Sequence, residues 1–430
     1  MGNYHQFRVK YDMKYKIYYD KYYYAMILFD MVIKNYERGT THLSVSLLNE
    51  IKGNFKGSKN FWKNILTSLI SKLNYLYSKI KRHNSVLILD SNKFKLLNEA
   101  IKTNTKKNKK SIKVVAPKKI MDIRGIIIPK TVIYNKDLKN LLESISIENL
   151  PEILENEYLM NSFNLNIKKS VFQVNQILKV NNIESIYTIS DQKFENRLIC
   201  EAAKLSQIPF FVFLHGYPQG GEYIGVLPFH GSKLLVWNRE QKERLSKIMD
   251  INKLEIFGYP KFDKLYLKKF QNVSTIKNKI TFISQPFEET GINFKRELVY
   301  SKLSKYKDDN YIINIRLHPK EKDDLVKINQ IINMGFKVST DSLLYDIYSS
   351  SKIIGYNSSV LYEAFLISND KVYQIDDDTP INFKYSFIKK LYLEDLEEIK
   401  NNDNHNTITQ SKYLIEDFKT EVKHLLISDN

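Results

Sequence analysis

Short apolar runs recur through the middle of the chain, and each is separated from the next by a longer amphipathic or polar stretch. In the first half these runs have the length of buried strands and lie at residues 86–89, 112–115, 125–128, 185–189, 210–214 and 234–237. Amphipathic stretches at about 136–180 and 196–205 are typical of helices. Strands that alternate with helices predict a parallel, doubly wound α/β sheet, in which 234–237 is the last strand.

A second series of apolar runs follows a turn at residues 258–263, where Gly and Pro interrupt the pattern. Its predicted strands lie at residues 280–283, 312–317, 353–355 and 372–375. A chain of 430 residues is long enough for two hydrophobic cores. The pattern therefore predicts a second α/β domain of the same kind as the first.

The remaining ends of the chain are predicted to be helical. The expected division is a helical N-terminal segment at 1–83, Rossmann-like domains at 84–255 and 256–410, and a helix at 411–430 that packs back on the domains. Within the N-terminal segment an apolar stripe runs from Trp62 to Ile80, and its lysines lie mostly off the stripe. Two interpretations fit this stripe, packing against its own domain, which we favour, and contact with an anionic membrane surface.

The charge and cysteine content limit the classes of partner. A net charge of +18 suits an acidic partner such as nucleic acid, an anionic membrane or a phosphorylated substrate. We do not expect nucleic acid, because no zinc-finger spacing, RNP-like aromatic strand or array of basic helices is present.

Cys200 is the single cysteine, so neither an intrachain disulfide nor a multi-thiolate metal site is possible. The apolar run at 22–29 is far shorter than the roughly 20 residues that cross a bilayer, and we expect a cytoplasmic protein.

Candidate chemistry gathers where the strands of the second domain end. His318 follows the strand at 312–317, and Ser358 with Ser359 follows the strand at 353–355 and opens a helix. Ligands of open α/β sheets bind at the carboxyl ends of the strands, and a helix N-terminus favours an anion. The sequence therefore predicts a phosphate between His318 and the two serines. The ordinary alternative for the serines is a helix N-cap.

Five further residues are assigned to the same predicted phosphate site. Arg316 and Lys320 add positive charge, Pro319 fixes the loop, and Gln285 lies in the polar loop after the strand at 280–283. Glu363 comes one helical turn after Ser359, where it is able to accept a hydrogen bond from a sugar hydroxyl.

The first domain offers a second set of candidates at its own strand ends. The strand at 210–214 leads into His215 and Gly216, and Gly220, Gly221 and Glu222 follow. His215 is able to take a proton near neutral pH, although a structural histidine is an equal alternative. Asp191 lies beyond the strand at 185–189 and is assigned, with Gly216, to the acceptor side.

The order of these motifs resembles bacterial glycosyltransferases of surface polysaccharide assembly that have the GT-B fold. His-Gly-Tyr-Pro at 215–218 and Gly-Tyr-Pro-Lys-Phe-Asp at 258–263 are similar to the CDP-glycerol glycerophosphotransferases. Ile-Ser-Gln-Pro-Phe at 283–287, His-Pro at 318–319 and Ser-Ser at 358–359 are similar to bacterial sialyltransferases and polysialyltransferases, whose donor is CMP-linked. The resemblance covers roughly residues 185 to 366.

The resemblance implies two Rossmann-like domains that face each other across a cleft, and an inverting transfer without metal or cofactor. His215 matches the catalytic base of the polyol-phosphate branch, His318 matches the histidine that assists the departing phosphate, and Ser358 and Ser359 hold the donor phosphate. Glu222 is a candidate for the acidic base motif of the sialyltransferase branch, which the chain lacks.

The reaction that the resemblance favours moves a sugar from a nucleotide-activated donor to a surface glycan, capsule or lipid-linked acceptor. A CMP-linked sialic-acid-like sugar is the favoured donor, and a UDP-sugar is the second choice. The alternatives are a CDP-polyol phosphotransferase of the teichoic-acid type and a nucleotide-sugar 2-epimerase-like isomerase. We also expect peripheral contact with the inner face of the cell membrane.

Overall fold

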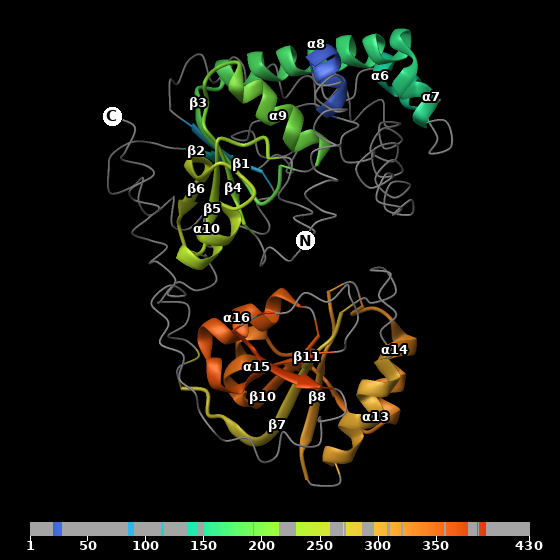
Figure 1. The fold of residues 1–430 in the computed structure, drawn as a ribbon, viewed down its shortest axis with the longest axis vertical. Helices are drawn as coiled ribbons and strands as arrows, with labels where there is room; N and C mark the ends of the chain where they lie inside the picture. The colour runs from blue at the N-terminus through green and yellow to red at the C-terminus, as the bar shows by residue number, and fades with distance from the viewer. Residues whose placement is uncertain are drawn as a thin grey trace.

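The structure is a computed structural model (Figure 1). It describes residues 20–27, 85–89, 113–115, 136–143, 150–191, 193–214, 229–258, 270, 272–285, 296–307, 310–319, 321–356, 358–376, 385 and 387–392. The predicted strand at 125–128, the apolar stripe at 62–80 and the predicted helix at 411–430 lie outside these residues.

The first domain is built on a six-stranded sheet in which every neighbouring pair is parallel. In spatial order its strands are β2 (Lys113–Val115), β1 (Ser85–Ile88), β3 (Ile183–Thr188), β4 (Phe210–Phe213), β5 (Lys233–Val236) and β6 (Leu254–Ile256). The prediction that 234–237 is the last strand is wrong, because β6 pairs with β5 through Leu234 and Leu254. The predicted boundary between residues 255 and 256 falls inside β6.

Helices cover this sheet and supply most of its core. They are α6 (Lys136–Glu143), α7 (Leu150–Glu155), α8 (Glu157–Val180), α9 (Phe194–Lys204) and α10 (Arg239–Leu245), with a 3-10 turn at Ile251–Lys253. Helix α8 begins at Asn156, whose side-chain oxygen accepts a hydrogen bond from the Leu159 N–H at 3.0 Å. Its buried apolar residues recur every three or four positions, so one face of a long helix packs inward.

Residues 20–27 form a helix that packs against α8 and α9 (Figure 1, blue). The backbone N–H groups of Tyr24 and Ala25 donate to the Asn164 side chain of α8 at 2.8 and 3.2 Å. The Tyr23 hydroxyl donates to Glu201 of α9 at 2.7 Å. Residues 20–27 therefore pack on the first domain. The interpretation of the stripe at 62–80 stays a prediction, because those residues lie outside the described part of the chain.

The second domain holds another six-stranded parallel sheet. In spatial order its strands are β12 (Lys389–Tyr392), β11 (Val372–Asp376), β10 (Ser350–Gly355), β7 (Ile276–Ile283), β8 (Ile312–Arg316) and β9 (Lys337–Val338). Numbered along the chain within this domain, the spatial order is 6-5-4-1-2-3, which is the strand order of Rossmann folds read from its other end. The prediction of two Rossmann-like α/β domains is confirmed.

The two faces of the second sheet differ in character. Helices α13 (Arg296–Lys307) and α14 (Leu325–Asn333) lie on one side of the sheet, and α15 (Leu343–Ser349) and α16 (Ser359–Ile367) lie on the other, with a 3-10 turn at Asn369–Lys371 (Figure 1). Ile280 and Phe282 of β7 join an apolar core with α13. Their neighbours Lys279 and Thr281 point to the opposite face, because successive side chains of a strand alternate, and there they enter a polar network with α15 and β10.

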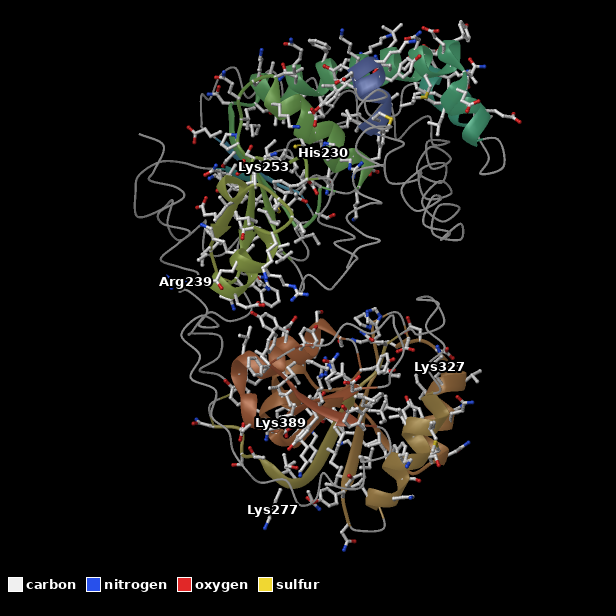
Figure 2. The ribbon with its side chains drawn as sticks, viewed as in Figure 1. His230, Arg239, Lys253, Lys277, Lys327 and Lys389 are labelled. Carbon is white, nitrogen blue, oxygen red and sulfur yellow. The ribbon has the colours of Figure 1, made fainter. Side chains whose placement is uncertain are left out.

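A buried carboxylate ties the N-terminal helix to α9. Glu201 accepts hydrogen bonds from Tyr23 and from Lys204, the latter at 2.6 Å, and lies 3.3 Å from Nδ1 of His230 (Figure 2). Burial by itself raises the pKa of Glu201, but the hydrogen bonds from His230, Lys204 and Tyr23 outweigh it and lower that pKa to about 2.

This pKa gives a prediction for acid stability. Glu201 in the unfolded chain binds a proton below its ordinary pKa of 4.5, whereas the folded chain does so only near pH 2. Its contribution to the free energy of unfolding is therefore complete above pH 4.5 and is lost as the pH falls toward 2. Denaturant titrations should show that the stability gap between the wild type and Glu201→Gln shrinks by about 2 kcal/mol from about pH 5 to about pH 3. A gap that does not change with pH would contradict this.

Candidate functional site

The candidate site lies where the strand order of the second sheet reverses. From β7 the chain first builds β8 and β9 on one side, and it then crosses back to place β10 on the other side. Ile283, the last residue of β7, is level with Arg316 of β8 and with Gly355 of β10. The loops that follow these three strands therefore leave the sheet side by side. Such a reversal point at the carboxyl ends of strands is the usual ligand position in open α/β sheets.

The two serines after β10 have different roles. Ser358 is 7% exposed and caps α16, since its hydroxyl oxygen accepts a hydrogen bond from the Val360 N–H at 3.3 Å. Its carbonyl oxygen accepts from the Leu361 N–H at 3.0 Å and from the Tyr385 hydroxyl at 3.1 Å. Ser359 is partly exposed, and within the described part of the chain neither its hydroxyl nor its N–H is hydrogen bonded. Ser359 is therefore the serine left to bind an anion at this helix start.

A buried glutamate holds the loops after β7 and β8 together. Glu321 is 2% exposed, and its Oε2 accepts hydrogen bonds from the Ser284 hydroxyl at 3.0 Å and the His318 N–H at 3.2 Å. Its Oε1 lies 3.4 Å from Nζ of Lys327 on α14 (Figure 2). The Glu321 N–H in turn donates to the His318 carbonyl at 2.8 Å. The position of His318 is thus fixed through its backbone, which leaves the half-buried imidazole at the edge of the sheet.

Sequence reasoning missed Glu321. The signal was present in His-Pro-Lys-Glu at 318–321, where a carboxylate three residues after the histidine is able to close a turn. Its contact with Ser284 spans 37 positions of the chain, so it was not visible in the local pattern.

Three other predicted residues lie close to these loops. Gln285 directly follows Ser284 and is half-buried, and Pro319 is exposed beside His318. Glu363 is buried on α16, one turn after Ser359. Their contacts with a donor stay predictions. Lys320 lies outside the described residues.

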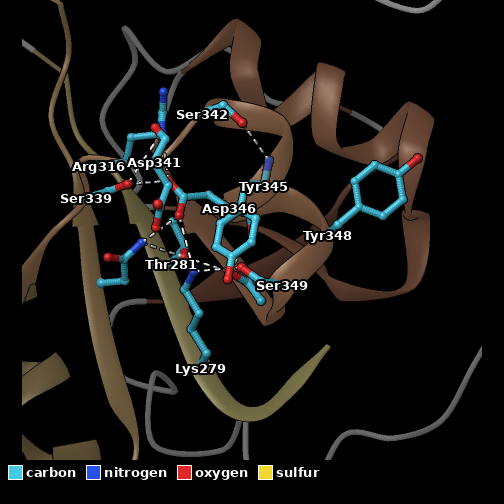
Figure 3. Close-up of polar contacts among 12 residues, drawn as sticks. Lys279, Thr281, Arg316, Ser339, Asp341, Ser342, Tyr345, Asp346, Tyr348 and Ser349 are labelled. Carbon is cyan, nitrogen blue, oxygen red and sulfur yellow. Dashed lines mark hydrogen bonds and ion pairs between the residues drawn. The ribbon is translucent and has the colours of Figure 1, made fainter. Parts of the chain in front are cut away.

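Arg316 belongs to a buried polar network beneath α15 (Figure 3). Its Nη1 donates to Oδ2 of Asp346 at 2.7 Å and to the Asp341 carbonyl at 2.9 Å. Asp346 is 1% exposed, and its Oδ1 also accepts from Lys279 at 3.2 Å and from Asn314 at 3.1 Å. Nη1 therefore makes structural hydrogen bonds, whereas within the described part of the chain Nε and Nη2 have no hydrogen-bond partner. The predicted phosphate contact of Arg316 stays a prediction.

The candidates of the first domain are only partly described. Asp191 is buried, and its Oδ2 accepts hydrogen bonds from the N–H groups of His230 and Gly231 at 2.7 and 3.2 Å. These contacts hold the backbone at the start of the segment that leads into β5. His215, Gly216 and Glu222 lie outside the described residues. The role of Asp191 on an acceptor side stays a prediction.

Neither a cluster of metal ligands nor a membrane-spanning helix occurs among the described residues. Across those ranges, no three His, Cys, Asp or Glu side chains are grouped as metal ligands would be. No helix within the same ranges has both the length and the apolar character needed to cross a membrane.

Comparisons with known proteins found similar solved structures. No family model matches the chain, and no curated protein matches it. The UDP-GlcNAc 2-epimerase of Methanocaldococcus jannaschii in complex with UDP-GlcNAc and UDP is 12% identical and has a TM-score of 0.48, and the match covers 81% of this chain and 100% of that chain. The wall teichoic acid polymerase TagF is 13% identical with a TM-score of 0.41, over 87% of this chain and 92% of that chain. The lipopolysaccharide outer core galactosyltransferase WaaB is 10% identical with a TM-score of 0.38, over 73% and 87% of the two chains.

The network around Asp346 predicts a large loss of stability in one variant and little in its neighbour. Asp346→Ala leaves the Lys279 and Arg316 cations without their buried carboxylate, which should cost about 3–5 kcal/mol of the free energy of unfolding. Asp341→Ala is the matched control, because Asp341 meets Arg316 only through its backbone carbonyl and its own side chain is exposed. The control should change the free energy of unfolding by less than about 0.5 kcal/mol. Equal losses in the two variants, measured by denaturant titration, would refute the network.

Proposed function

We propose that the protein is a glycosyltransferase that moves a sugar from a nucleotide-activated donor to an acceptor hydroxyl. In this proposal the donor phosphate lies at the carboxyl edge of the second sheet. The observation that carries it is the placement of His318 and Ser359 on either side of β7, at the reversal point of a sheet with Rossmann strand order.

Each flanking residue offers a group that suits a phosphate. The Ser359 N–H and hydroxyl donate at the start of α16, where the helix dipole favours negative charge. Glu321 holds the His318 backbone at the end of β8, and in this proposal the His318 imidazole donates to a phosphate oxygen. The unbonded edge of the Arg316 guanidinium supplies a third source of positive charge near the end of β8.

The proposed chemistry is a single displacement with inversion. The acceptor oxygen attacks the anomeric carbon, and the bond between that carbon and the phosphate oxygen breaks, so the phosphate leaves with the electron pair. His215 takes the acceptor proton, with Glu222 as the alternative base. His318 and Ser359 stabilise the negative charge that grows on the departing phosphate, the step at which fixed hydrogen-bond donors help most.

The finer assignments follow the motif resemblance. The Ile-Ser-Gln-Pro-Phe and His-Pro motifs favour a CMP-linked, sialic-acid-like donor, with a UDP-sugar as the second choice. The acceptor is then a surface glycan or a lipid-linked glycan, and the basic N-terminal segment favours a cytoplasmic enzyme that contacts the inner face of the membrane. No metal or cofactor is required in this scheme.

A nucleotide panel tests the proposal. Full-length protein should be stabilised against heat by at least one of CMP, CDP, UDP and GDP, because a ligand that binds only the folded state raises the melting temperature. The matching nucleotide sugar should release nucleotide only when an acceptor glycan is added. Isomerisation of the sugar without acceptor would identify the protein as a 2-epimerase instead. Transfer of a polyol phosphate from a CDP-polyol would identify it as a phosphotransferase. A chain that none of the nucleotides stabilises would contradict the proposal.

Substitution of each serine in turn should separate an effect on nucleotide binding from an effect on folding stability. Ser359→Ala removes a hydroxyl that hydrogen bonds only to the ligand, so nucleotide affinity should fall roughly ten-fold with little change in stability. Ser358→Ala removes the cap of α16, so the free energy of unfolding should fall by about 1 kcal/mol with a smaller effect on affinity. Calorimetric titration with the best nucleotide and denaturant unfolding measure the two quantities. The reverse pattern would show that the Ser358 hydroxyl, and not the Ser359 hydroxyl, binds the nucleotide phosphate.

A further inference from the structure

Three aromatic rings connect the two domains. Trp237 follows β5 of the first domain, Tyr362 lies on α16 of the second, and Tyr385 lies between β11 and β12. The Trp237 and Tyr362 rings stack with centroids 5.8 Å apart and planes inclined by 23°, and the Tyr362 and Tyr385 rings stack at 6.4 Å and 7°. All three side chains are fully buried. We call these three residues the interdomain stack.

Each end of the interdomain stack is tied to the backbone of a candidate-site loop. The Trp237 indole Nε1 donates to the Leu214 carbonyl at 2.6 Å, and Leu214 is the residue directly before His215. At the other end, the Tyr385 hydroxyl donates to the Ser358 carbonyl at 3.1 Å. The stack therefore joins the start of the loop proposed for the acceptor to the start of the helix proposed for the donor phosphate.

Polar contacts fix the orientation of the central ring and of the indole. The Tyr362 hydroxyl accepts a hydrogen bond from Nδ2 of Asn238 at 2.7 Å and lies 3.5 Å from Oε2 of Glu240. The indole is fixed by its hydrogen bond to Leu214, and the Trp237 backbone N–H donates to Oε1 of Gln241 at 2.8 Å. Asn238, Glu240 and Gln241 all belong to the start of α10, so one short segment of the first domain contacts the Tyr362 hydroxyl and the Trp237 backbone. Rings that are buried and hydrogen bonded at their polar ends have few alternative positions.

We propose that the interdomain stack is a positioning element that holds Leu214, which directly follows β4, at a fixed place relative to Ser359. This inference rests on the proposed function, because a transfer reaction needs the acceptor oxygen and the anomeric carbon at a defined distance. A displacement of about 1 Å between two bound reactants is enough to slow such a reaction by roughly a hundred-fold. The nucleotide is proposed to bind within the second domain, and Trp237 belongs to the first, so substitution of Trp237 should leave the nucleotide affinity unchanged.

The alternative is a purely structural role, in which these rings only stabilise the fold. The two interpretations differ in what a variant changes. A purely stabilising stack lowers the melting temperature and leaves the turnover of the folded enzyme intact. If the stack positions the two sites, its variants lower the kcat of the folded enzyme.

The test uses full-length variants at both ends of the Trp237–Tyr362 contact. Tyr362→Leu removes the stack, and we expect kcat to fall at least roughly ten-fold. The nucleotide Kd is read from the Trp237 variant instead, because Tyr362 lies one helical turn from Ser359 on α16. Tyr362→Phe keeps the ring and should recover most of that loss. Trp237→Phe keeps an aromatic ring but loses the hydrogen bond to Leu214, so kcat should fall with the nucleotide Kd within about two-fold of wild type. This variant also serves if Tyr362→Leu does not fold.

Tyr306→Leu is the matched control. Tyr306 is a buried aromatic residue of α13 that contacts Tyr311 edge-on, with centroids 5.6 Å apart, and α13 covers the side of the second sheet opposite α16 (Figure 1). This variant should lose stability and keep the wild-type kcat. Wild-type kcat in both Tyr362→Leu and Trp237→Phe would overturn the proposal.

Hydrogen exchange gives a readout that does not depend on activity. In Tyr362→Leu, amide exchange should rise together in the peptides that contain Phe213–Leu214 and Ser358–Leu361, and in Tyr306→Leu it should rise in neither. A rise in only one of the two peptides would show that the stack does not join them. If no nucleotide binds the wild-type protein, the proposed function fails, and the exchange result still decides whether the stack holds the two loops.

Discussion

Strand β7 occupies the centre of the second sheet, with β8 on one side and β10 on the other. Because parallel strands pair in register, the end of β7 is level with Arg316 and Gly355, and three loops must leave the sheet at one place. The Ser284 N–H extends this ladder by one hydrogen bond to the Arg316 carbonyl at 2.9 Å. Everything proposed for this protein depends on that pairing, since a slip of register would separate His318 from Ser359.

Two buried carboxylates stabilise the edge that this pairing creates. Glu321 links the loops after β7 and β8, and Asp346 links the face of the same two strands to α15. Both carboxylates are hydrogen bonded and paired with cations, which is the condition under which a buried charge is tolerated. The opposite face of the sheet is apolar and packs on α13. Apolar packing also stabilises the face toward α15 and α16, through Ile347, Ile353 and Leu361. That face in addition carries the polar contacts that fix geometry near the candidate site.

Most of the architecture was readable from the sequence, because buried strands and amphipathic helices leave local patterns. The runs that became β1, β3, β4, β8 and β10 were all identified in this way. Strand β6 was not recognised as part of the first sheet, because three residues are too few for a strand pattern and its assignment depends on pairing with β5. The residues of the candidate site likewise include some that the local sequence predicts and some that it does not. His318 and the two serines were found from their positions after strands, whereas the choice between Ser358 and Ser359 depends on which hydroxyl the helix start already uses. Glu321 and the interdomain stack were not predicted, because their partners are distant in the chain.

The central claim is that a nucleotide binds where β7, β8 and β10 end. Photocrosslinking of the full-length protein with an azido-nucleotide, followed by peptide mapping, tests it most directly. The account predicts label in peptides that contain Ser284–Gln285, His318–Glu321 or Ser358–Leu361, and competition of that labelling by the unmodified nucleotide. Competable label confined to the first domain, or to the amino ends of the strands of the second sheet, would contradict it.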